Sequence, residues 1–149
     1  MEHPKELLNA ALKEAMKNKD NERRDVIRLL TSAIKQVEID TQKEVTAEQA
    51  LEILQKEAKK RRESIAELTS AGRAEQAAAE QYELTVLEEF LPRQLTADEI
   101  TALAREAIAQ TGAASGKDMG KVMGALQPLT KGRADGKLVS QIVKDLLGG

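Results

Sequence analysis

Apolar residues recur at helical spacing along almost the whole chain. Near its start, for example, Leu8, Leu12 and Ala15 lie three or four residues apart and would share one face of a helix. Segments with this spacing span about residues 4–19, 21–40, 46–72, 73–90, 96–111, 115–128 and 135–147. No segment alternates apolar and polar residues for long enough to predict a strand. We therefore predict an all-α protein.

Residues that favour helix N-termini stand where the predicted helices begin. Thr46 and Gln49 have the spacing of a capping box, and so do Thr96 and Glu99. The other expected caps are Asp20, Ser115 together with Asp118, and Asp135.

Pro92, in the stretch FLPRQL, interrupts the helical pattern and marks the expected boundary between two lobes. Residues 1–91 are predicted to form an N-terminal lobe of about four helices. Residues 92–149 are predicted to form a small C-terminal three-helix bundle, whose sixth helix ends or bends at Pro128.

Composition narrows the classes of function. The 149 residues include no cysteine and a single histidine, His3, in a terminus expected to fray, so we predict no metal site, no cofactor and no histidine-dependent catalysis. The chain has no apolar run of signal-peptide or membrane-span length, which predicts a soluble cytoplasmic protein without membrane contact. Tyr82 and Phe90 are the only aromatic residues, too few for base-stacking platforms, so any RNA binding would use phosphates and shape.

Three glycines stand four residues apart in the sixth predicted helix, at Gly116, Gly120 and Gly124. On a helical wheel, Gly120 and Gly124 form a strip between the apolar face, which includes Leu129, and the lysines Lys117 and Lys121. Two interpretations fit this strip. A neighbouring helix could pack closely against the bare backbone, or a phosphate backbone could approach it with the lysines as counter-charge.

Basic residues are concentrated in the second lobe. The chain carries a net charge of −2, yet the segment from Gly112 to the end has six Lys and Arg against three Asp. The segment after the glycine strip could be a solvated polar turn or part of a modest anion-binding face, and its basic excess favours the face. Our candidate nucleic-acid-binding residues are Lys117, Lys121, Lys131, Arg133 and Lys137, with Gly120, Gly124 and Gly132 as positions of close approach.

Arg61 interrupts the apolar stripe of the third predicted helix, in the stretch KEAKKRRES. We expect its guanidinium either to pair with a carboxylate from a facing helix or to reach solvent. The neighbouring residues Lys59, Lys60 and Arg62 form a secondary basic face, which is either a solvated surface or a second site.

Four stretches of the chain resemble the GatB/YqeY family, and together they cover nearly its whole length: VIRLLTSAIKQVEID, KRRESIAELTSAGR, LEEFLPRQLTADEI and DMGKVMGALQPLTKGRADGKLV. The last is the most specific, and it looks like the tail of the B subunit of the bacterial tRNA-dependent amidotransferase, which converts Glu or Asp mischarged on tRNA to Gln or Asn.

This resemblance implies an all-helical fold of two lobes and a tRNA-contacting role for the second, with Lys121, Lys131 and Arg133 as the positions to carry over. The ammonia-producing and kinase-like domains of the amidotransferase are missing here, so the expected function is a non-catalytic tRNA-binding or tRNA-associated module. The alternative is a protein-interaction adaptor that docks helices of a tRNA synthetase or amidotransferase. A catalytic role, as an accessory associated with carbon–nitrogen ligation, ranks third. The oligomeric state is left open.

Overall fold

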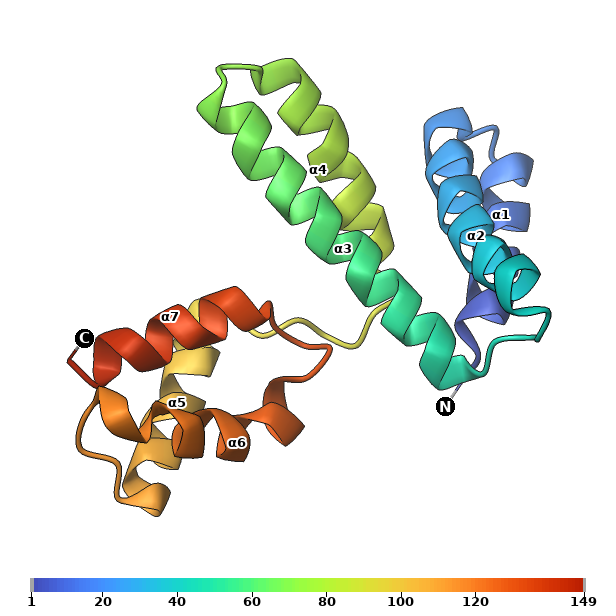
Figure 1. Ribbon diagram of the computed structural model, residues 1–149. Helices are drawn as coiled ribbons and strands as arrows, with labels where there is room; N and C mark the ends of the chain where they lie inside the picture. Colours follow the sequence, from blue (N-terminus) through green and yellow to red (C-terminus); the bar gives the residue numbers. More distant parts are fainter. Residues whose placement is uncertain (1, 149) are drawn as a thin grey trace. The chain divides into compact units, whose positions relative to one another are not determined.

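The computed structural model describes residues 2–148, and over these residues it is all-helical, with seven α-helices, one short 3₁₀-helix and no strand (Figure 1). The prediction of an all-α fold is thus confirmed. The elements are α1 (Pro4–Lys17), α2 (Asn21–Thr41), α3 (Ala47–Ser70), α4 (Ala74–Glu88), α5 (Ala97–Thr111), η1 (Gly116–Asp118), α6 (Met119–Thr130) and α7 (Gly136–Leu146). The chain divides into two compact units, Met1–Pro92 and Arg93–Gly149.

The N-terminal unit consists of two helical hairpins, α1 with α2 and α3 with α4 (Figure 1). One apolar core joins them, and α2 contributes to it most fully, with Ile27, Leu30 and Ile34 at most 1% exposed. Leu54 of α3 and Leu87 of α4 complete the centre of this core. Both hairpins therefore form one folded unit because they share buried apolar surface.

The C-terminal unit packs α5, α6 and α7 around a smaller core. Ile100, Leu126 and Val143 are fully buried at its centre. Leu129, predicted to be buried, is instead 48% exposed, and Thr130 takes the inward place in the last turn of α6. The reason is that the buried stripe keeps a spacing of four residues, through Leu126 to Thr130, and so drifts around the helix.

The predicted caps are present at most helix starts. Thr46 and Gln49 form a complete capping box at α3, and Thr96 and Glu99 form one at α5. Asp20 and Asp135 accept backbone N–H groups at α2 and α7. These contacts satisfy donors that a helix start leaves without intrahelical partners.

The sixth helix begins later than predicted. Ser115 accepts the backbone N–H of Lys117 and opens the 3₁₀ turn η1, after which α6 starts at Met119. Pro128 does not end α6. It lies inside the last turn of the helix, which continues to Thr130.

The expectation that His3 frays was wrong. His3 caps α1: its Nδ1 accepts the backbone N–H of Lys5 at 3.2 Å, while its Nε2 lies 3.1 Å from the carbonyl oxygen of Val45. Glu38 accepts both the Val45 N–H, at 3.0 Å, and the Lys5 ammonium, at 2.9 Å. Polar contacts from α1 and α2 therefore hold both backbone groups of Val45, in the connection before α3.

Candidate nucleic-acid interface

Gly120 and Gly124 lie on an open face of α6. Both are exposed, and a methyl group added at either Cα would meet no atom within 4 Å. Within the C-terminal unit, therefore, no neighbouring helix packs against these two glycines, contrary to the first of our two interpretations. Gly116 lies in η1, outside the α-helix, so it is not part of a regular strip. The backbone of α6 is left accessible at two successive turns.

Lysines accompany this accessible backbone. Lys117 lies in η1 and Lys121 in the first turn of α6, and both are exposed. Lys131 is exposed directly after α6. Within residues 2–148, no carboxylate oxygen lies within 4.0 Å of the ammonium group of Lys117, Lys121 or Lys131. These three charges are therefore solvated and available to an external anion.

The candidate basic residues fall into two groups at opposite ends of α6. Lys117 and Lys121 lie at its N-terminal end, whereas Lys131, Arg133 and Lys137 belong to the connection with α7 and to the first turn of α7. Lys131 lies ten positions after Lys121, which corresponds to about 15 Å along a helix axis. The arrangement therefore suits an extended polyanion better than a single small anion.

The connection between α6 and α7 is braced by the segment that precedes α5. Leu95 donates its backbone N–H to the carbonyl oxygen of Arg133 at 2.7 Å, and the Gln94 amide donates to that of Gly132 at 3.1 Å. In return, the Arg133 Nε donates to the carbonyl oxygen of Arg93 at 3.2 Å. Arg133 is thus partly a structural residue. This bracing was missed in the sequence, since it joins residues about 38–40 positions apart.

Gly132 has a conformational reason to be glycine. Its φ of 75° lies in the left-handed region, which residues with a Cβ adopt at a cost. The turn at Gly132 carries the chain from α6 back toward α7, between Lys131 and Arg133.

One carboxylate moderates the positive field at the start of α6. Asp118 accepts the backbone N–H of Ala114 at 3.0 Å, and this hydrogen bond lowers the pKa of its carboxyl group. Desolvation opposes the shift, and the charge of Lys121 adds to it. Asp118 therefore stays ionised at neutral pH, and it offsets part of the positive charge of Lys121.

Arg61, in the N-terminal unit, pairs as we expected. Its Nη1 lies 3.0 Å from Oε2 of Glu57 on the same helix, and its Nε lies 3.3 Å from Oε2 of Glu83 on α4. The Arg61 side chain is only 13% exposed. The guanidinium therefore links α3 to α4.

The secondary basic face lies on α3. Lys59 and Lys60 are exposed, and Arg62 is partly buried. The Lys60 ammonium lies 3.9 Å from Glu57, at the long limit of an ion pair. This face belongs to the other unit from the residues around α6.

Within the described residues, no group of three or more His, Cys, Asp or Glu side chains could hold a metal ion. Over the same part of the chain, no helix combines the length and the apolar character needed to cross a bilayer. The surface around α6 offers solvated ammonium groups and open backbone, which bind anions by charge and hydrogen bonding.

A family model described as "Yqey-like protein" matches residues 5–147. This match covers nearly the whole chain, so the protein belongs to the YqeY-like family. A search of curated proteins gave no match.

Proposed function

We propose that this YqeY-like protein is a non-catalytic RNA-binding module that contacts tRNA through the basic surface around α6. One observation carries the proposal: Lys117, Lys121 and Lys131 have no carboxylate partner within residues 2–148 and stand beside open helix backbone. The open backbone at Gly120 and Gly124 supports it further, because no helix of the C-terminal unit covers these two glycines.

The choice of tRNA as the RNA rests on a resemblance. The stretch from Asp118 to Val139 is similar to the tail of the B subunit of the tRNA-dependent amidotransferase, which contacts tRNA. Lys121, Lys131 and Arg133 stand at the positions carried over from that similarity. Since two groups of charges lie about 15 Å apart, both would contribute phosphate contacts to one RNA molecule.

A titration of bulk bacterial tRNA with the full chain at low salt tests the proposal. Lysine–phosphate contacts release counterions, so binding is expected at low salt and should weaken as salt is added. No detectable binding at low salt would contradict the proposal.

The second candidate is an adaptor that docks a helix of a synthetase or amidotransferase against α6. The side chain of Leu129 favours it, since this leucine is 48% exposed and gives α6 some apolar surface, on a different side of the helix from Gly120 and Gly124. Docking through apolar surface depends little on salt, so a salt series with a purified partner separates it from RNA binding.

A further inference from the structure

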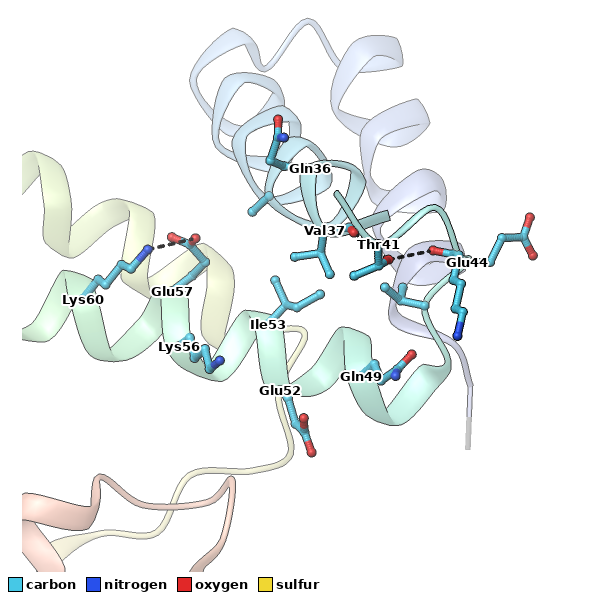
Figure 2. Close-up of a pocket in the computed structure, with 13 residues that line it drawn as sticks. Gln36, Val37, Thr41, Glu44, Gln49, Glu52, Ile53, Lys56, Glu57 and Lys60 are labelled. Carbon is cyan, nitrogen blue, oxygen red and sulfur yellow. Dashed lines mark hydrogen bonds and ion pairs between the residues drawn. The ribbon is translucent and has the colours of Figure 1, made fainter. Parts of the chain in front are cut away.

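A groove of about 710 Å³ runs between α2 and α3 in the N-terminal unit (Figure 2). Four residues of α2 line one wall, and six residues of α3 line the other. They are Ala33, Gln36, Val37 and Thr41 on α2, and Gln49, Glu52, Ile53, Lys56, Glu57 and Lys60 on α3. The connection between the two helices closes one end, where Val45 is buried. We propose that this groove binds an acidic amphipathic helix of another protein.

The groove has an apolar strip along its centre. Val37 of α2 and Ile53 of α3 extend toward the space between the helices, and both are only partly buried (Figure 2). Ala33 lies one turn before Val37 on the same face and also lines the groove. Contact with an apolar partner would remove this strip from water, which is the main driving force for helix docking.

The shape of the groove selects a helix as the occupant. Its walls are the surfaces of two α-helices, whose side-chain ridges accept the ridges of a third helix. The lining of α3 runs from Gln49 to Lys60, which corresponds to about 16 Å of helix axis, or three turns. A partner helix of about three turns would therefore fill the groove, with its apolar side on Val37 and Ile53.

The charges select an acidic partner. The lining residues of α2 are uncharged, whereas α3 contributes the lysines Lys56 and Lys60 together with two glutamates, Glu52 and Glu57. No carboxylate oxygen within residues 2–148 lies within 4.0 Å of the Lys56 ammonium. The Lys60 side chain is 74% exposed, and its contact with Glu57 is long, at 3.9 Å.

The carboxylates of the groove do not cancel these lysines. Glu57 is already engaged by Arg61 at 3.0 Å. Glu44 and Glu52 lie toward the closed end with Lys43, and Figure 2 shows Glu44 and Glu52 extending away from the central strip. A helix with acidic residues beside its apolar face would place them along Lys56 and Lys60.

A pair of designed peptides tests this proposal with the full-length protein. The first is a 14-residue helical peptide with leucines at positions i, i+4, i+7 and i+11 and glutamates beside them, and the second has lysines in place of the glutamates. Fluorescence anisotropy of the labelled peptides should show at least a tenfold preference for the acidic one. Equal affinity for both peptides, or no binding of either, would overturn the proposal.

Variants with matched controls identify the surface. Lys56→Glu combined with Lys60→Glu should reverse the peptide preference, while Lys59→Glu, on an exposed residue that does not line the groove, should preserve it. Ile53→Asp should weaken the acidic peptide at least tenfold, and Ile39→Asp, on a 59% exposed residue outside the groove, should not. Ile53 is partly buried, so an aspartate there can unfold the N-terminal unit. If the melting curve of Ile53→Asp changes, the peptide preference of the Lys56→Glu and Lys60→Glu variant decides whether the groove is the binding surface.

Binding of RNA at the same place is the rival outcome. If Lys56→Glu with Lys60→Glu weakens bulk tRNA binding and leaves the acidic peptide unaffected, the α3 lysines serve RNA and the helix-docking proposal fails. This test is independent of the surface around α6, because none of the substituted residues lies in the C-terminal unit.

Discussion

In the N-terminal unit, Lys5, Arg23 and Arg61 each lie within 3.0 Å of a carboxylate oxygen. In the C-terminal unit, Lys117, Lys121 and Lys131 have no carboxylate within 4.0 Å among residues 2–148. The first set of charges joins segments of the unit to one another: α1 to α2, the start of α2 to the end of α4, and α3 to α4. Among the described residues of the C-terminal unit, the second set forms no such link. These three basic residues of the N-terminal unit thus support its tertiary structure, whereas the three lysines around α6 remain available to a partner.

The largest effect is expected from the charges around α6. Lys121→Ala, Lys131→Ala and Arg133→Ala combined should weaken bulk tRNA binding by roughly 10- to 100-fold at low salt, about 1.4–2.8 kcal/mol, because up to three phosphate contacts are lost. The control is Lys59→Ala with Lys60→Ala, for which we expect a smaller loss. If the control abolishes binding and the triple variant retains it, the assignment of the interface to the C-terminal unit is wrong. A double variant without Arg133→Ala separates binding from the bracing of the α6–α7 connection.

The next effect is on stability and belongs to the other unit. Arg61→Ala should leave Glu57 and Glu83 without their shared cation and lower the free energy of unfolding of the N-terminal unit by about 1–2 kcal/mol. The value is modest because both carboxylates are partly solvated. Thermal melting followed by circular dichroism measures it, and tRNA affinity should stay within twofold. A variant with unchanged melting and weakened RNA binding would place Arg61 in the interface instead.

A glycine substitution separates packing from accessibility. Gly124→Ala should raise the free energy of unfolding of the C-terminal unit by roughly 0.5–1 kcal/mol, because alanine favours the helix and its methyl group meets open space. Gly124→Leu should likewise not lower the melting temperature. If phosphates approach this backbone, Gly124→Leu should weaken tRNA binding. A fall in melting temperature would show that something in the protein does pack against this glycine.

The smallest expected effect is on the stability of the C-terminal unit at acidic pH. Two guanidinium N–H groups of Arg93, followed in strength by the backbone N–H of Thr96, lower the pKa of Glu99 to about 2. Since the folded-state pKa is depressed, this stabilisation is fully present above the ordinary pKa of 4.5 and is lost as the pH falls from there toward 2. Glu99→Gln should therefore flatten the pH dependence of the melting temperature in this window. An unchanged profile would show that the pair contributes nothing to stability.

Local signals made much of the fold predictable. The capping boxes at Thr46 and Thr96 are encoded within four residues, and the chain carries them without help from distant segments. The helical period placed all seven helices, but it did not show which faces a neighbour covers. Leu129 was assigned to the core for that reason, although its turn of α6 buries Thr130 instead.

Contacts between residues far apart along the chain could not be predicted from the sequence. The position of Arg61 on an apolar stripe predicted either an ion pair or a side chain that reaches solvent, and nothing in the sequence identified Glu83, 22 residues away, as a partner. The contact of His3 with Val45 spans 42 positions of the sequence. It holds the N-terminal segment that we had expected to fray. Within the candidate interface, the charge distribution along the sequence was enough to select the basic residues. The open face at Gly120 and Gly124 could be recognised only once the arrangement of α5, α6 and α7 was known.

The salt dependence of tRNA binding by the full chain tests the central claim most directly. A plot of the logarithm of the association constant against the logarithm of the salt concentration has a slope of about −0.7 to −0.9 per phosphate contact. We predict a clearly negative slope that Lys121→Ala, Lys131→Ala and Arg133→Ala together flatten by up to about three units. A flat plot for the unsubstituted protein, or identical slopes for the protein and its triple variant, would contradict the claim that the solvated charges around α6 bind RNA.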